Sequence, residues 1–188
     1  MSNDQPLDNP SSAYPVQEIA AAWQRERPGT PVSSIRIVTP LWRLAKLFGD
    51  DRRRVLAQAG VDTATLDLLS VLRRAGEPYA LTTRELAARS LITAGAISQR
   101  VSRAEREGLV TRRPGESRRR SVVVELTPLG HEVVESTVDQ VLTREADLLT
   151  GLTPEQQNQL AELLRVLLQD VQRRLGDTRL SQVGEKDD

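Results

Sequence analysis

Residues 81–126 decide the fold, and they read LTTRELAARSLITAGAISQRVSRAEREGLVTRRPGESRRRSVVVEL. Near the start, Thr82 or Thr83 is placed to cap a short helix over residues 84–89, because its hydroxyl can accept a hydrogen bond from the first helical turn. Glu85 stands three residues after Thr82, which is the spacing of a capping box. The stretch therefore opens with a short, well-defined helix.

A longer helix and two β-prone runs follow. Thr93 caps the helix, which is expected to reach Glu107, and Gly108 ends it where a left-handed residue is favoured. Residues 109–113 and 121–126 are rich in β-branched side chains, and the arginine-rich linker between them is typical of a hairpin tip. Helix, turn, helix and basic hairpin in this order predict a winged helix-turn-helix. The alternative is an ordinary helical subdomain with a charged turn.

The longer helix has two chemically different faces. At about 100° per residue, Ile97, Val101 and Ala104 share one side with Gly108, while small and hydrogen-bonding residues cluster opposite. Such a polar face suits the major groove, and a first turn of small residues lets backbone amides approach a phosphate. Gln99 and Arg103 are the best candidates to read base edges, and the hairpin tip is expected to reach the DNA backbone or minor groove. The predicted DNA-binding residues are Thr93, Gly95, Ser98, Gln99, Ser102, Arg103, Arg106, Arg118, Arg119 and Arg120.

Charge is distributed unevenly in a chain whose net charge is zero. Residues 100–120 hold eight arginines and three glutamates, which is 8 − 3 = +5. A neutral protein with one strongly basic segment indicates a local anionic partner, and nucleic acid is the usual one. A solvated basic loop is the alternative reading.

Composition excludes several classes of protein. The chain of 188 residues has no cysteine and one histidine, His131, so disulfides, thiolate catalysis and cysteine or histidine metal sites are not expected. No nucleophile–base pair is apparent, so we expect neither an enzyme nor a cofactor. The first residues lack a signal-peptide pattern and no apolar run reaches the roughly 18 residues of a membrane span, so a cytoplasmic protein without membrane partners is expected.

The fold class expected for the whole chain is mainly α with a small β-wing: a winged helix-turn-helix domain plus a helical dimerisation lobe. The last helix carries eight leucines and valines between Leu160 and Leu175, a wider apolar surface than one small lobe can cover, so a partner helix is expected. The predicted division is a disordered arm at 1–14, N-terminal helices of a dimer and effector lobe at 15–60, the winged domain at 61–127, dimerisation helices at 128–176 and a flexible tail at 177–188.

The stretches LTTRELA, ITAGAISQRVSRAEREGLVTRR and RRSVVVELTPLG resemble the winged domain of MarR-type regulators, and the resemblance extends over roughly residues 15–175. It implies an obligate homodimer whose terminal helices form the dimer lobe. Family wings usually carry an acidic tip of the pattern D-P-x-D-R-R, whereas Arg118 stands here in place of the second aspartate. The missing acidic brace and added positive charge are expected to raise non-specific affinity and steepen its salt dependence.

A narrower resemblance, to the urate-responsive MarR regulators with an extra first helix, rests on AAWQRERPGTP and LDLLSVLRRAGEPYALT. It implies an effector site made by Trp23, Asp67, Arg100 and Arg112. Arg100 lies roughly 60–80° from the centre of its helix's apolar face, so it can point into a crevice. Two arginines suit an anion, and Trp23 could stack on a planar one. Each residue also has an alternative role: Trp23 as a helix anchor, Asp67 as the partner of a neighbouring arginine, Arg112 as a phosphate contact.

These expectations combine into one function. The chain is expected to be a dimeric, sequence-specific transcriptional regulator, a repressor that leaves a pseudo-palindromic operator when a small anion binds. The anion would be urate-like or a tricarboxylate such as citrate or aconitate. The alternatives are an effector-independent architectural DNA-binding protein and a dimeric scaffold that does not bind DNA.

Overall fold

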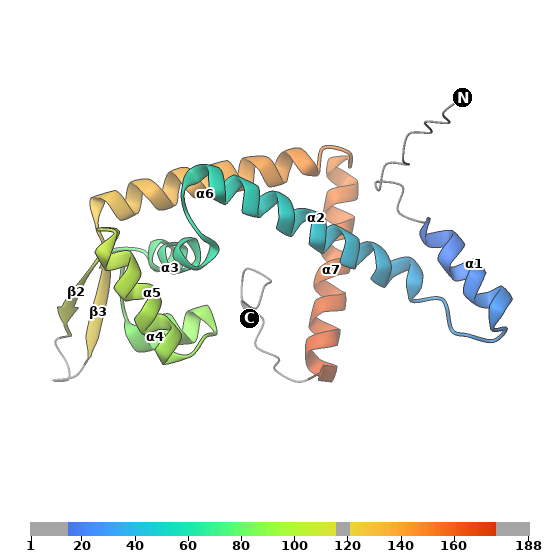
Figure 1. Cartoon of the computed structure of the whole chain (residues 1–188), viewed down its shortest axis with the longest axis horizontal. Coiled ribbons are helices and arrows are strands. Elements are labelled where there is room, and N and C mark those ends of the chain that lie inside the picture. The colour runs from blue at the N-terminus through green and yellow to red at the C-terminus, as the bar shows by residue number, and fades with distance from the viewer. Residues whose placement is uncertain (1–14, 116–120, 176–188) are drawn as a thin grey trace, which may run out of the picture. The chain divides into compact units, whose positions relative to one another are not determined.

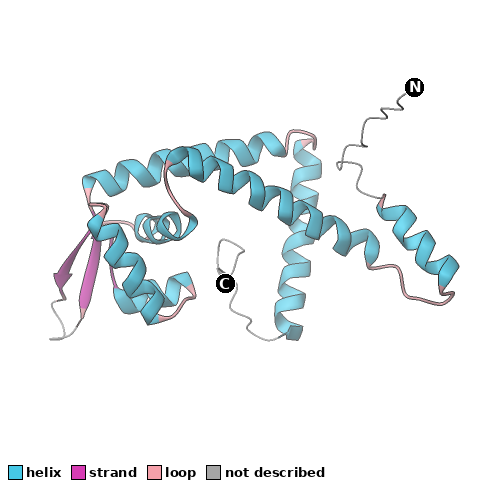
Figure 2. Cartoon of the chain, in the orientation of Figure 1, coloured by secondary structure: helices cyan, strands magenta, loops and turns pink. Residues whose placement is uncertain are grey.

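The computed structural model describes residues 15–115 and 121–175. The chain divides into two compact units, Met1–Asp50 and Asp51–Asp188. The predicted arm at 1–14, the predicted tail at 177–188 and the tip arginines Arg118, Arg119 and Arg120 lie outside the described residues. Helices make up most of the described chain (Figure 2).

The first unit contains α1 (Val16–Glu26) and the beginning of α2 (Ile35–Ala59), which continues into the second unit. No residue of α1 is buried, and Trp23 is 51% exposed. On α2, Trp42 is 73% exposed and Ile37 and Leu47 are also exposed. Both helices therefore present large apolar side chains on their surfaces.

The second unit has α3 (Thr63–Arg74) at its centre, where Leu68, Leu69 and Leu72 are almost completely buried. The helices α4 (Thr83–Ser90), α5 (Ala94–Arg106) and α6 (Pro128–Leu148) pack on it. Figure 1 shows α4 and α5 side by side, next to the strands β2 and β3. The core is aliphatic throughout, as the scarcity of aromatic residues requires.

Helix starts follow the caps that the sequence indicates. Asp62 accepts a hydrogen bond from the backbone N–H of Thr65 at 2.8 Å, and Thr82 and Glu85 form the predicted capping box. Thr93 caps α5 and Thr127 caps α6. The limits predicted for the two helices of residues 81–126 are confirmed to within one or two residues, since their N-terminal caps are specified by side chains within three positions.

The sheet has one strand more than the sequence indicated. Strands β1 (Ala80–Thr82), β2 (Val110–Pro114) and β3 (Val122–Leu126) form an antiparallel sheet in the order β1-β3-β2. The predicted hairpin of β2 and β3 is confirmed, but β1 was missed: Leu81 pairs with Val124 and ties the chain before α4 to the wing. A three-residue strand is too short to be recognised from alternation in the sequence.

Helix α7 (Pro154–Leu175) ends the described chain and has no buried residue. Its exposed apolar side chains are those of Leu160, Leu163, Leu164, Val166, Leu167, Leu168, Val171 and Leu175. Over the described ranges, no single helix is long and apolar enough to cross a membrane; only the bent pair of α2 and α3 reaches that length and composition together. The expected fold class, mainly α with a small winged-helix sheet, is confirmed.

Candidate functional site

The helix α5 separates its apolar and polar residues cleanly. Ile97, Val101 and Ala104 are fully buried against the rest of the second unit. The predicted DNA-binding residues of this helix and its cap lie on the other side: Ser102 is half-buried, and the exposed ones are Thr93, Gly95, Ser98, Gln99, Arg103 and Arg106. The packing thus leaves a polar helix face open to an outside partner.

The start of α5 is open as well as small. The Oγ1 of Thr93 accepts a hydrogen bond from the backbone N–H of Ala96 at 3.2 Å, which fixes the first turn. Outside its chain neighbours and the backbone of its own helix, the nearest atom to a Cβ added at Gly95 would be Thr93 Oγ1, at 4.0 Å. The fold itself therefore does not require glycine at this position, whereas a close approach by an external phosphate would.

Arg103 is exposed but already engaged by two carboxylates. Its Nη1 lies 2.7 Å from Asp62, the cap of α3, and its Nε lies 2.9 Å from Glu107. The hydrogen bond to Glu107, followed by the charge of Asp62, raises the pKa of the Arg103 guanidinium above its ordinary value. Because its side chain is 55% exposed, these ion pairs are weak enough to exchange for another anion.

Asp67 on α3 and Arg100 on α5 form a sheltered ion pair. Arg100 Nη1 lies 2.9 Å from Asp67 Oδ2, and the Asp67 side chain is only 5% exposed. Burial raises the pKa of Asp67 above its ordinary value, and the charge of Arg100 opposes that rise. The pair connects the central helix to the polar-faced helix, so a ligand that disturbed it would act on α5 directly.

A cavity of about 590 Å³ adjoins this ion pair between α3 and α6. Asp67 reaches it from one side, and three further arginines, which the sequence analysis did not single out, reach it too. Asp67, Ser70 and Arg74 are spaced i, i+3 and i+7, so helical periodicity could have predicted that they share the face of α3 that lines the cavity. The lining residues are Arg52, Leu66, Asp67, Ser70, Arg73, Arg74, Val134, Glu135, Val138, Asp139 and Leu142.

The four predicted effector residues do not all meet. Asp67 and Arg100 are brought together, as described above. Arg112 instead donates from Nη2 to the Ser102 hydroxyl at 2.5 Å, and its Nε lies 3.2 Å from Glu105. Trp23 belongs to the first unit, which is described by itself. The predicted site is therefore represented in the second unit by the Asp67–Arg100 pair.

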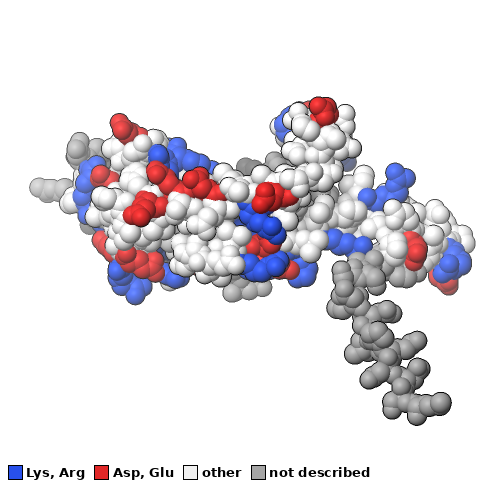
Figure 3. Space-filling model, turned by 90° about the horizontal axis from the view of Figure 1, so that it is seen from above, with Lys and Arg blue, Asp and Glu red and all other residues white. Residues whose placement is uncertain are grey.

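Charged side chains elsewhere in the molecule are mixed in sign. Figure 3 shows acidic and basic residues interspersed on the face seen from above. The sequence assigns an excess of positive charge, +5, to residues 100–120. Any attraction of a polyanion is thus expected to be local to α5 and the wing.

Comparison with known proteins places this architecture in one family. The model of the MarR family matches residues 59–121. The HTH-type transcriptional regulator PecS of Dickeya dadantii (strain 3937) is 29% identical over 149 residues, which cover 79% of this chain and 90% of that protein.

Solved structures agree with the sequence matches. A MarR family transcriptional regulator from Streptomyces coelicolor, in complex with DNA, is 30% identical with a TM-score of 0.61, and the match covers 74% of this chain and 92% of that one. A mutant MarR from E. coli, complexed with operator DNA, is 26% identical with a TM-score of 0.58, covering 70% and 95%. With its helix-turn-helix, three-stranded sheet and polar α5 face, the chain belongs to the MarR family of DNA-binding transcriptional regulators.

Proposed function

We propose that the chain is a homodimeric repressor that binds a pseudo-palindromic operator and leaves it when a small anion binds beside Asp67 and Arg100. The separation of faces on α5 carries this proposal. Its apolar side chains are fully buried, so the exposed polar residues opposite them have no role in the core. The expected role of that face is to enter the major groove.

The proposed DNA contacts begin at the open N-terminus of α5. Thr93 and Gly95 would lie against a phosphate, with Ser98 and Gln99 one turn further at base edges. Ser102, Arg103 and Arg106 follow along the helix, and Arg103 would exchange its two carboxylate partners for DNA. The wing tip, with Arg118, Arg119 and Arg120, would add contacts to the backbone or minor groove.

Helix α7 supports the dimer. A helix with eight exposed leucine and valine side chains and no buried residue leaves a large apolar surface in water. A second copy of the same helix would cover it, and a two-fold axis would present two α5 helices to two half-sites. The half-sites of such operators lie about one helical turn of DNA apart.

The effector proposal rests on a cavity that is lined by Asp67, the ion-pair partner of Arg100. An anion entering the cavity of about 590 Å³ would compete with Asp67 for Arg100 and could also use the neighbouring arginines. Because Arg100 stands on α5, capture of its guanidinium would favour a different position of that helix. For release to follow, the anion must bind the DNA-incompetent form more tightly.

The experiment uses a labelled duplex obtained by in vitro selection with the wild-type protein, titrated with urate, citrate and aconitate. Release by one of these anions, weakened in Arg100→Ala, supports the proposal. If none releases the DNA and Arg100→Ala changes only DNA affinity, the effector site is refuted while DNA binding stands. A uniform, salt-sensitive footprint without preferred sequence would instead indicate an effector-independent architectural protein.

A further inference from the structure

A single guanidinium joins the wing to the helix α5. Arg112 on β2 donates from Nη2 to Ser102 Oγ at 2.5 Å, while its Nε lies 3.2 Å from Glu105 Oε2. Ser102 and Glu105 are three residues apart, so the two contacts span one turn of α5. The planar fork of arginine can reach both groups from a fixed position.

The strand places Arg112 on the side that faces α5. Arg112 is opposite Val124, which is fully buried, and it follows Val110, which is 2% exposed, by two positions. Residues that alternate in a strand share one face of the sheet. Arg113 therefore points to the other face, where its Nε lies 3.3 Å from Glu125 on β3. The side chains of Arg112 and Arg113 thus lie on opposite faces of the sheet.

The contact continues along the helix. The Ser102 hydroxyl accepts from Arg112 and donates to the backbone carbonyl of Ser98 at 2.8 Å. Its single proton is used in that second bond, so the hydroxyl is oriented by both partners. Ser98 and Ser102 belong to the proposed DNA-binding face. Arg112 is therefore linked by hydrogen bonds to residues of the face that would meet DNA.

We propose that Arg112 is a positioning residue that fixes the wing against α5, so that both elements meet DNA as one preorganised body. This proposal rests on the proposed DNA-binding function. A wing that moved independently of α5 would have to be ordered at the moment of binding, at a cost in affinity. The loss should fall mainly on the selected sequence, where helix and wing must fit together.

The test measures dissociation constants over a salt series for the selected duplex and for a shuffled duplex of the same composition. Arg112→Ala is expected to weaken binding to the selected duplex about three- to tenfold, as for one lost charged hydrogen-bond network. Affinity for the shuffled duplex and the salt dependence should stay as in the wild type. Arg112→Lys, which keeps the charge but lacks the fork, should lose nearly as much.

Two further variants separate positioning from charge. The double variant Glu105→Gln with Arg112→Ala should bind the selected duplex as tightly as Arg112→Ala alone, because each substitution removes the same contact between β2 and α5. Arg113→Ala removes an equal charge from the same strand without touching α5, and its ratio of selected to shuffled affinity should match the wild type. Thermal unfolding of each variant separates a loss of fold from a loss of fit, and Arg112→Lys serves if Arg112→Ala does not fold.

Each outcome has one reading. Equal losses on both duplexes, with a salt slope smaller by about one, would make Arg112 a phosphate contact and overturn the proposal. An unchanged Kd for the selected duplex in Arg112→Ala would leave the contact without a role in DNA binding. If the wild type itself does not prefer the selected duplex, the proposed function fails, and the positioning role fails with it.

Discussion

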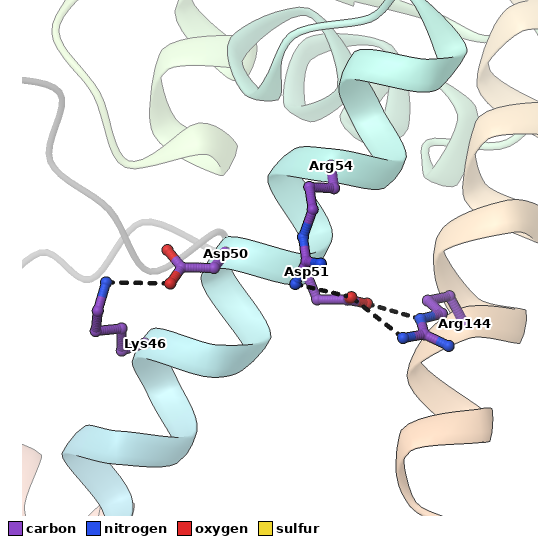
Figure 4. Close-up of polar contacts among 5 residues, drawn as sticks. All are labelled: Lys46, Asp50, Asp51, Arg54 and Arg144. Atoms are coloured by element: carbon purple, nitrogen blue, oxygen red, sulfur yellow. Dashed lines mark hydrogen bonds and ion pairs between the residues drawn. The ribbon is translucent and has the colours of Figure 1, made fainter. Parts of the chain in front are cut away.

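Asp51 on α2 accepts two hydrogen bonds from Arg144 on α6, from Nε at 2.8 Å and from Nη2 at 3.2 Å (Figure 4). The next residues, Arg52 and Glu145, pair with the signs reversed, at 2.6 Å. Two adjacent positions on each helix therefore form complementary ion pairs. Displacing α6 along α2 would separate both ion pairs, so these pairs favour one alignment of the two helices.

Asp51→Asn is expected to lower the stability of the protein in a pH-dependent way. The Arg144 hydrogen bond holds the pKa of Asp51 below its ordinary value. Its contribution is therefore fully present above about pH 4, the range of an unfolded aspartate, and is lost as pH falls through the lower pKa of the folded state. Urea midpoints at pH 7 should favour the wild type, and the difference should shrink at lower pH. Glu162→Gln, which breaks an exposed pair within α7, should change little at pH 7.

Arg100→Ala is also expected to differ less from the wild type in stability as pH falls, here because of a raised pKa. Burial already raises the pKa of Asp67, and removing Arg100 takes away the nearest charge that opposes the rise. The variant's stability relative to the wild type should therefore increase as pH is lowered from 7 to 5, because the raised pKa lets Asp67 bind a proton at a higher pH than an ordinary aspartate does. Unfolding in urea at both values tests this. The double variant with Asp67→Asn should lack the trend; if it keeps it, another group is titrating.

Gly130→Ala should destabilise the second unit. A Cβ at this position would lie 2.1 Å from the backbone oxygen of Leu109, and backbone atoms cannot move aside cheaply. The expected loss is about 1–3 kcal/mol or more, measured by urea unfolding. Gly151→Ala is the matched control, because nothing lies within 4 Å of its added Cβ. Its effect should stay within about 0.5 kcal/mol.

A charge placed on the apolar face of α7 should separate the proposed dimer. Leu164 and Leu167 lie one turn apart on that face and are about 40% exposed in the single chain. Leu164→Glu with Leu167→Glu would bury two carboxylates in an apolar interface, so the dimer Kd should rise about 100-fold or more. Analytical ultracentrifugation measures it. Gln169→Glu adds a charge elsewhere on the same helix and should remain dimeric; equal dissociation of both variants would contradict this interface.

Gly95→Ala separates folding from DNA binding. The space around Gly95 is open, so alanine should leave stability unchanged or raise it by up to about 1 kcal/mol. Binding to the selected duplex should weaken several-fold if the backbone of α5 approaches a phosphate at this point. Thermal unfolding and fluorescence anisotropy measure the two effects. Undiminished DNA affinity would place the phosphate elsewhere.

The sequence predicts this fold well wherever the signal is local. Thr82 with Glu85, and Thr93 with Ala96, lie within three residues of the groups they bind, so their caps are legible in the sequence. The buried face of α5 is equally legible, since one helical period fixes it. Strand β1 was missed because Leu81 is extended only through its pairing with the distant Val124.

Side-chain partners are harder to predict than faces. The angular position of Arg100 indicated a crevice, and its partner there is Asp67. For Arg112 and Arg103 the same reasoning gives no partner. Arg112 reaches Ser102 only because β2 packs on α5, and Arg103 reaches Asp62 only because α3 begins beside it. These side-chain partners depend on how elements distant in sequence pack together, and helical or strand periodicity does not predict that packing.

The central position of β3 has a consequence for how this protein can change over evolution. Strand β3 is bonded on one side to β2 and on the other to β1, which leads directly into α4. The position of β3 is therefore fixed by pairing along both of its edges. Substitutions in the segment between β2 and β3 are therefore expected to change the proposed DNA preference with little loss of stability, so this segment is where we expect relatives to diverge in the sequences they bind.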